Sequence, residues 1–192
     1  MRLSVDQYHR MIEQGILEEG LPIELLDGQL QWKDRSAAGE DRMTVGHEHV
    51  WVVKAISELN PKFRRHGCYA RGQQPVTFLP RSEPEPDIAI VTGNRERYRQ
   101  RHPSPADIVC LIGVSDSSLD RDRSRKLKIY ANGGIEHYFI VNLVDRVIEA
   151  YRSPIAGRGR YAEVSTLDAR QKLTIPTATG PGVTVTVKSL FP

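Results

Sequence analysis

Two short apolar runs in the middle of the chain limit what it can fold into. Residues 87–91 (DIAIV) and 107–114 (DIVCLIGV) are almost continuously apolar, and each run opens with an aspartate. A strand with one face in water alternates apolar and polar residues, whereas a strand covered on both faces does not. The two runs therefore predict central strands of a sheet with helices on both sides, as in an α/β protein.

The segments next to these runs predict how the strands are connected. Residues 92–105 are basic and polar, which favours a short helix or a loop. Ser117 or Ser118 can cap a helix that extends to about Asn132, and Gly133-Gly134 ends it. Residues 137–142 (HYFIVN) predict the next strand, parallel to the second apolar run and joined to it by a right-handed crossover. The inner side of the helix carries Leu127, Tyr130 and Ala131.

The N-terminal third predicts a helix, a hairpin and a second helix. Ser4 and Gln7 form a capping-box pattern ahead of a helix over residues 5–14. Asp27-Gly28 tolerates the positive φ of a two-residue turn, so residues 23–32 (IELLDGQLQW) predict a hairpin. Residues 36–41 form a polar connection, and Pro61 ends a helix expected over residues 48–60.

The remaining segments predict further strands. Residues 68–78 alternate and contain a Gln-Gln-Pro break, which is typical of an edge strand. Residues 147–151 can pair with 137–142, and short strands from Arg160 onward, including 180–187, predict a β-rich tail. Because no repeat or linker divides the chain, we expect one α/β domain over residues 1–192, with a central mixed sheet flanked by helices.

Composition narrows the class of protein. The chain has 192 residues, 39% hydrophobic and 27% charged, which predicts a folded globular protein rather than a disordered one. No apolar run approaches the roughly 20 residues that span a bilayer, and the first residues lack a secretory pattern. Cys68 and Cys110 have no metal or redox spacing, so we expect a protein of the reducing cytoplasm.

The net charge of +3 permits nucleic-acid binding but does not by itself indicate it. Basic residues gather in three segments, 62–71, 95–101 and 121–128. These segments are either solvated surfaces or a surface that contacts phosphate groups, and the sequence leaves both open. In the second case the candidate contacts are Arg95, Arg97, Arg121, Arg123 and Arg125.

Asp87 is the first candidate for a functional residue. It follows two prolines in SEPEPDIAIV and opens a buried strand, where its carboxylate would lie at the edge of the sheet. Mg²⁺ is held in many enzymes by one or two carboxylates together with substrate phosphate. The alternative is that Asp87 only bonds nearby backbone at the start of the strand.

Several motifs in order resemble the Uma-two family, a bacterial group of restriction-endonuclease-like proteins with the PD-(D/E)XK nuclease fold. IELLDGQL (23–30) is similar to the family's opening hairpin, His49 to the histidine that starts its helix, and EPEPDIAIV (83–91) to its acidic strand. VSDSSLDRDRSRKLKIYANGGIEHYFIVNL (114–143) resembles its longest motif, and the terminal LFP is also family-like. The resemblance covers nearly the whole chain.

The resemblance implies a metal site made of Asp87, an acid on the next buried strand and a nearby lysine. The position of the second acid is occupied here by Gly113. Loss of a carboxylate removes a negative ligand and part of the stabilisation of the transition state. The backbone carbonyl of Val114 remains available to a metal, and Asp116 or Asp122 could substitute for the missing acid. Strand alternation disfavours Asp116, because positions 113 and 116 face opposite sides.

The resemblance places the lysine at Lys126, on the helix that follows. Asp122, Lys126 and Tyr130 are spaced four residues apart and share one helical stripe. Lys126 would orient the attacking water and offset phosphate charge; the alternative is a solvated ion pair with Asp122. Glu24 would bind the metal through water or orient Lys126, unless it faces solvent on the hairpin.

His47 and His49 are the only histidines close enough in sequence to suggest zinc. No cysteine or further histidine accompanies them, so we expect no zinc site. His49 is instead a supporting residue of the site implied by the resemblance.

The sequence leaves three functions open. The first is a Mg²⁺- or Mn²⁺-dependent endonuclease that hydrolyses DNA, impaired to the extent that Gly113 weakens metal binding. The second is an inactive nuclease-fold module that binds DNA or protein, in which Gly113→Glu would raise metal affinity. The third is a metal hydrolase for another substrate, because fold does not fix substrate. By analogy with nucleases that cut two strands, we expect a homodimer.

Overall fold

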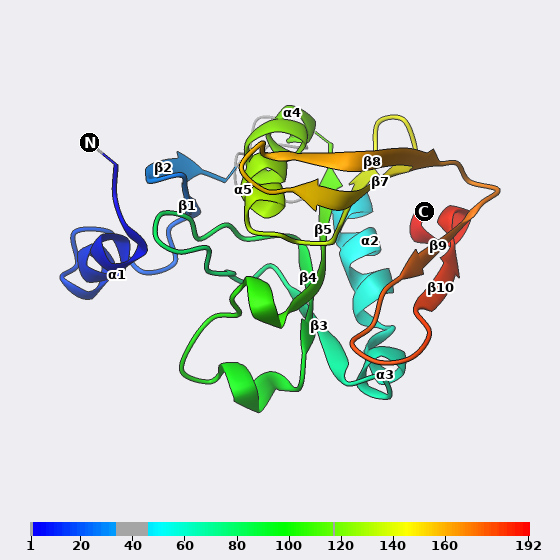
Figure 1. Ribbon diagram of the computed structural model, residues 1–192, viewed down its shortest axis with the longest axis horizontal. Helices are drawn as coiled ribbons and strands as arrows, with labels where there is room; N and C mark the ends of the chain where they lie inside the picture. Colours follow the sequence, from blue (N-terminus) through cyan, green and yellow to red (C-terminus); the bar gives the residue numbers. More distant parts are fainter. Residues whose placement is uncertain (1, 34–45, 117) are drawn as a thin grey trace.

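The two apolar runs form neighbouring strands at the centre of a six-stranded sheet (Figure 1). In this computed structural model, which describes residues 2–33, 46–116 and 118–192, they are β4 (Ile88–Thr92) and β5 (Ile108–Ser115). Four residues of β4 and six of β5 are buried in succession, as expected for strands covered on both faces. The α/β class predicted from these runs is confirmed.

The sheet has the order β3-β4-β5-β6-β7-β8 and is mixed. β5 and β6 (His137–Asn142) run parallel, as the intervening helix predicts, and every other neighbouring pair is antiparallel. β7 (Val147–Ile155) and β8 (Arg160–Leu167) complete one side of the sheet, so the tail contributes a long strand to it. β3 (Cys68–Gly72) is the opposite edge, as predicted.

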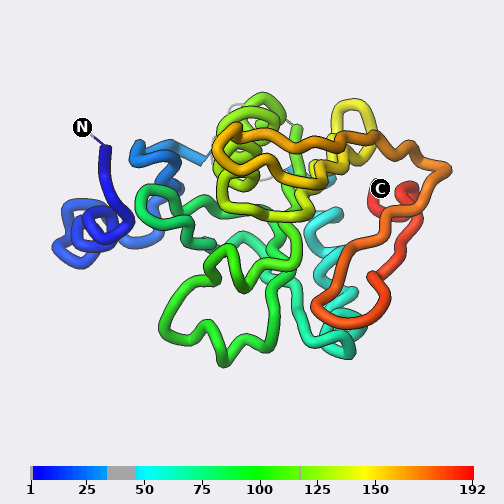
Figure 2. The backbone as a smooth tube through the Cα atoms, viewed as in Figure 1, coloured from blue at the N-terminus to red at the C-terminus, as the bar shows by residue number. Residues whose placement is uncertain are grey.

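Helices cover the two faces of the sheet, one on each side in Figures 1 and 2. Even-numbered residues of β4 pack with α2 (His47–Ser57), in a core that also includes the hairpin of β9 (Lys172–Ile175) and β10 (Val183–Thr186). Odd-numbered residues of β4 face α5 (Leu127–Asn132), where Tyr130 and Tyr138 are fully buried. This alternation decides which face each site residue can reach.

The N-terminal helix and hairpin form as predicted. In α1 (Val5–Glu13), Ser4 and Gln7 make both hydrogen bonds of the capping box. β1 (Ile23–Leu26) and β2 (Gln29–Trp32) are joined by Asp27 and Gly28, whose φ angles are 50° and 75°. The polar connection predicted over residues 36–41 lies outside the described residues.

Two predicted element boundaries are wrong. α2 ends at Ser57, and Pro61 lies in the first turn of α3 (Asn60–Arg64), where a missing N–H costs nothing. The strand predicted over residues 68–78 ends at Gly72 because Gln73 adopts a positive φ of 49° and the chain leaves the sheet. No described helix is long and apolar enough to cross a membrane.

The helix predicted between β5 and β6 contains a π-helical turn. α4 (Leu119–Arg121) leads directly into the π turn (Asp122–Lys126), which continues as α5 up to a C-cap at Gly133. The extra residue in the turn rotates the side chains before it relative to those after it, and such turns are frequent at functional sites. Of the two predicted caps, Ser117 lies outside the described residues, and Ser118 occupies the N-cap position.

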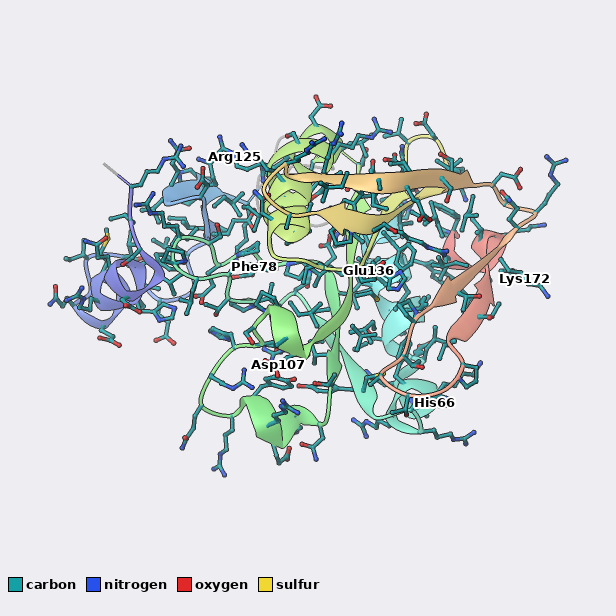
Figure 3. The ribbon with its side chains drawn as sticks, in the orientation of Figure 1. His66, Phe78, Asp107, Arg125, Glu136 and Lys172 are labelled. Carbon is teal, nitrogen blue, oxygen red and sulfur yellow. The ribbon has the colours of Figure 1, made fainter. Side chains whose placement is uncertain are left out.

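The basic loop between β4 and β5 is organised around one carboxylate. Asp107, labelled in Figure 3, is buried and accepts hydrogen bonds from the guanidinium groups of Arg97 and Arg101 and from the hydroxyl of Ser104. The hydrogen bonds from Arg101, followed by those from Ser104, hold the pKa of Asp107 well below its usual range. Arg97, predicted as a phosphate contact, therefore has a structural partner in the fold.

We predict that Asp107→Asn lowers the free energy of unfolding by about 2–3 kcal/mol at neutral pH, because the amide loses charge-assisted hydrogen bonds. The folded-state pKa of Asp107 is depressed, so its contribution is complete above the unfolded pKa of about 4 and is lost as the pH falls. Urea unfolding of both proteins at about pH 7 and pH 3 measures this difference. A gap of equal size at both pH values would contradict the account.

Candidate active site

Asp87 lies at the point where β4 enters the sheet. The register that pairs Ile88 with Ile112 puts Asp87 opposite Gly113. One carboxylate oxygen is 2.7 Å from Nε2 of His49, and the other accepts a hydrogen bond of 2.7 Å from the backbone N–H of Val114. The side chain keeps 22% of its surface exposed, so it is held by the fold but remains accessible to a ligand.

Gly113 lies next to another carboxylate, that of Asp122. A Cβ atom at Gly113 would lie on the α5 face, 3.2 Å from the hydroxyl of Tyr138 and 3.8 Å from a carboxylate oxygen of Asp122. The carboxylate of Asp122 is therefore a direct neighbour of position 113, at ordinary van der Waals distance from the first atom of a side chain there. Of the two aspartates that could substitute for the missing acid, Asp122 is the one brought to that place, whereas Asp116 is exposed.

Asp122 is held in this position by hydroxyl groups. Its Oδ2 atom accepts hydrogen bonds from Ser115, at the end of β5, and from Ser118, ahead of α4. Burial raises the pKa of Asp122, the charge of Lys126 lowers it, and the charge of Asp87 raises it again; the net direction is upward. A cation between the two aspartates would relieve this repulsion.

Lys126 joins the carboxylates to the segment before β4. Its Nζ atom is 3.3 Å from Oε2 of Glu24, 3.9 Å from Oδ1 of Asp122 and 3.2 Å from the backbone oxygen of Glu85. Burial lowers the pKa of Lys126, but the charges of Glu24, Asp122 and Asp87 outweigh it and raise the pKa. The ammonium group therefore stays charged at neutral pH. The predicted alternative of a solvated ion pair is wrong.

Glu24 belongs to the same cluster. It projects from β1 with only 1% of its surface exposed, so the alternative of a solvent-facing hairpin residue is wrong. Its Oε2 atom accepts a hydrogen bond of 3.0 Å from the backbone N–H of Glu85. Its Oε1 atom is buried and, among the described residues, has no hydrogen-bond partner. A buried carboxylate oxygen of this kind can accept a bond from a hydrated metal or a water molecule.

His49 and Tyr130 adjoin the cluster. Burial lowers the pKa of His49, but the hydrogen bond and charge of Asp87 outweigh it, and the pKa is raised. His49 therefore orients the Asp87 carboxylate, while His47 on the same helix is exposed. Tyr130 is fully buried one turn beyond Lys126, and its ring packs edge-on against Tyr138 at 4.9 Å.

The cluster fits a metal that brings its own water and phosphate ligands. Within the described ranges, no three His, Cys, Asp or Glu side chains converge closely enough to enclose an ion by themselves. Mg²⁺ does not require such a cage, since it keeps several waters and often binds one or two carboxylates with a phosphate. Asp87, bonded to the N–H of Val114, and Asp122, next to Gly113, are the two carboxylates that could hold such an ion.

The backbone of Val114 also faces the carboxylate of Asp87. The carbonyl of Ser115 accepts a hydrogen bond from Leu143, after β6, so the carbonyl of the preceding residue points the other way, toward β4. The N–H of Val114 already points there, because it donates to Asp87. The carbonyl proposed as a metal ligand from the sequence thus lies on the Asp87 side of the strand.

The predicted arginines lie in different surroundings. Arg95 is exposed and forms an ion pair with its neighbour Glu96, whereas Arg123 makes a bidentate ion pair with the buried Glu149. Arg125, on the π turn at the top of Figure 3, has one buried guanidinium nitrogen without a described partner. Ser118 was predicted as a helix cap, but sequence reasoning missed the other residues that position the π turn: Ser115, Asn142, Glu149 and Tyr151.

Comparison with known proteins identifies a matching family and a solved structure with a similar fold. The family model Uma2, described as "Putative restriction endonuclease", matches residues 5–188. Among solved structures, the fold is similar to that of a "putative nuclease belonging to DUF820" from Anabaena variabilis ATCC 29413. The TM-score is 0.70 at 13% sequence identity, over 98% of this chain and 97% of that one. No curated protein matches.

The position of Asp122 predicts how an acid restored at Gly113 will behave. We expect Gly113→Glu to lower the free energy of unfolding by about 1–3 kcal/mol, since the new side chain meets Tyr138 and a second carboxylate. Asp122→Ala should make room for it, so the double variant should be more stable than the two single changes predict, by about 1 kcal/mol or more. Denaturant unfolding of the four proteins measures the coupling. Strict additivity would show that the two positions do not share a space.

Proposed function

This chain belongs to the Uma2 family, and we propose on that basis that Asp87, Asp122, Glu24 and Lys126 form a metal-dependent centre that hydrolyses phosphodiester bonds in DNA. The observation that supports this most is the carboxylate of Asp122, which lies directly beside Gly113, the position of the missing acid. With it, the cluster has a second acid beside position 113, within 3.9 Å of Lys126, despite the glycine. A centre reduced to Asp87 alone would have offered a metal too little charge.

Mg²⁺ or Mn²⁺ is the cofactor that this set of residues favours, because every available ligand is an oxygen. Asp87, Asp122 and the carbonyl of Val114 would hold the ion, and Glu24 would contact it through water. A bound ion of this kind stabilises negative charge on the phosphate oxygens and helps deprotonate water.

Lys126 acts as a cation in this proposal and not as a base. Its pKa is raised by the carboxylates around it, so it keeps its proton at neutral pH. From there it can orient the attacking water through a hydrogen bond and offset charge on the phosphate. Glu24 keeps the ammonium group in place, and His49 keeps Asp87 turned toward Val114.

The reaction is a simple substitution at phosphorus. The oxygen of water forms a bond to phosphorus while the bond from phosphorus to one sugar oxygen breaks. The water gives up its proton to solvent, and the departing sugar oxygen takes one from solvent. Cutting both strands of a duplex needs two such centres, which is why we expect a homodimer.

A second candidate function is a module that binds DNA or protein without cleaving. The observation in its favour is that both oxygens of Asp87 already accept a hydrogen bond within the fold. In that case the cluster would have a structural role only, holding the hairpin, the helix and the sheet together.

Cleavage of plasmid DNA with added Mg²⁺ or Mn²⁺ distinguishes the nuclease from the binding module. We predict that the wild-type protein nicks the plasmid, and that Asp87→Ala and Asp122→Asn each lower the rate by about 100-fold or more, as expected when a charged ligand is lost. Asp116→Asn, an exposed aspartate of the same connection, is the matched control and should cleave at the wild-type rate. Equal rates for wild type and Asp87→Ala would rule out the centre.

Asp122→Asn distinguishes the two acids. If Asp87→Ala abolishes cleavage while Asp122→Asn leaves it unchanged, the metal is held without Asp122, and its carboxylate has a structural role only.

A further inference from the structure

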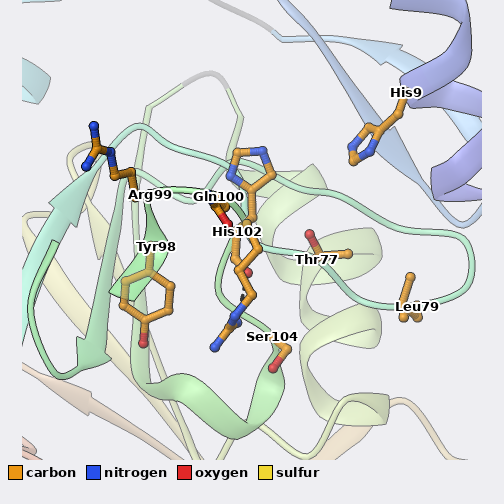
Figure 4. A pocket seen from close by; sticks show the side chains of 9 residues that line it. His9, Thr77, Leu79, Tyr98, Arg99, Gln100, His102 and Ser104 are labelled. Atoms are coloured by element: carbon orange, nitrogen blue, oxygen red, sulfur yellow. Dashed lines mark hydrogen bonds between the residues drawn. The ribbon is translucent and has the colours of Figure 1, made fainter. Parts of the chain in front are cut away.

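A second concave site lies between α1 and the basic loop that follows β4 (Figure 4). It is a pocket of about 660 Å³, and none of its nine lining side chains is acidic. Figure 4 shows His102 near its centre, with His9, Thr77 and Leu79 on one side and Tyr98 on the other. The lining residues that the proposal uses are His9, Thr77, Leu79, Tyr98, Arg101 and His102.

The charge around this pocket is positive. Asp107 accepts hydrogen bonds from both Arg97 and Arg101, so one negative charge faces two guanidinium groups. The guanidinium of Arg71 lies 5.3 Å from the centre of the Tyr98 ring, buried and, among the described residues, without a carboxylate partner. The guanidinium of Arg101 lies over the same ring, also at 5.3 Å. An excess of cations in a partly buried place attracts an anion.

Two further carboxylates near the pocket, Glu83 and Glu85, act on His102, and each already has partners. Glu83 is buried, lies 2.7 Å from Nε2 of His9, and accepts a hydrogen bond of 2.6 Å from the hydroxyl of Thr77. Glu85 is paired with Lys33. The remaining N–H groups of Arg101 and the ring of His102 are the donors that a ligand would meet.

The pocket and the Asp87 centre lie on the same stretch of chain. Glu83 bonds the strand that carries Glu24, through the carbonyl of Leu25, and faces the pocket. Glu85, two residues on, bonds Glu24 and Lys126 in the centre. The two sites are therefore connected through residues 83 and 85 of one short segment, so a single nucleic-acid strand could contact both.

We propose that this pocket binds a backbone phosphate of the DNA strand, next to the segment of strand held at the Asp87 centre. Arg101 and His102 donate to the phosphate oxygens. Leu79, of which 74% is exposed, and the edge of Tyr98 give an apolar surface that suits the attached sugar. Free inorganic phosphate would make no use of that surface. The inference rests on the proposed function, since it assigns the path of the same substrate.

The test is binding of a fluorescein-labelled 20-base-pair duplex, with EDTA present so that no strand is cut. We expect Arg101→Ala to raise the Kd about 3- to 10-fold at 0.1 M salt, and to reduce the slope of log K against log salt by about one, as for one lost phosphate contact. Arg99→Ala, a pocket residue outside the Asp107 cluster, should weaken binding in the same direction without affecting the fold. Lys172→Ala removes the same charge at the far right of Figure 3 and should change neither quantity.

Two results would overturn the proposal. In the first, both arginine variants match Lys172→Ala in affinity and in salt slope, so the pocket does not contact DNA. In the second, the variants bind DNA normally but lose binding of thymidine monophosphate or inorganic phosphate, so the pocket takes a free phosphate compound. Either result leaves the cleavage assay with Asp87→Ala unaffected, so failure of this inference is distinct from failure of the nuclease assignment.

Discussion

The buried ammonium group of Lys126 is the contact on which the arrangement of the centre depends. Glu24 comes from the hairpin, Asp122 from the π turn and the carbonyl of Glu85 from the segment before β4, and all three lie within 4 Å of the same nitrogen. Glu24 and Asp122 are almost fully buried, a state that carboxylates tolerate only when paired. Lys126 supplies that pairing, and by doing so it fixes three separate elements around the start of β4.

The π turn explains how a centre can survive with glycine at its second acid position. It carries Asp122 at its start and Lys126 at its end, and the two serines of the preceding connection hold Asp122 against Gly113. Arg123, between them, is tied to Glu149 on β7, which Tyr151 and Asn142 also hold. The ion pair between Arg123 and Glu149 thereby attaches the π turn to the sheet. Glycine suits position 113 in this arrangement, because a Cβ atom there would lie only 3.2 Å from the hydroxyl of Tyr138 and would also touch Asp122.

Local patterns predicted the parts of the fold that depend on local chemistry. The capping box of Ser4, the turn at Asp27-Gly28 and the buried runs of β4 and β5 follow from a few neighbouring residues each. The resemblance to a family indicated Asp87 and Lys126, and the structure brings Glu24 to the same cluster. The contact between Gly113 and Asp122 could not be predicted from the sequence, because it depends on a π turn. Regular helical periodicity does not contain such a turn. The Asp107 cluster was missed because its partners looked like a solvated basic loop.

We propose that Asp87 and Asp122 together replace the usual pair of acids at a metal site. A crystal of the protein soaked in MnCl₂, with anomalous diffraction measured near the manganese edge, would show whether they do. We expect an anomalous peak bounded by the carboxylates of Asp87 and Asp122 and the carbonyl of Val114. A structure at saturating manganese with no peak at that place, or with manganese bound only elsewhere on the chain, would contradict it.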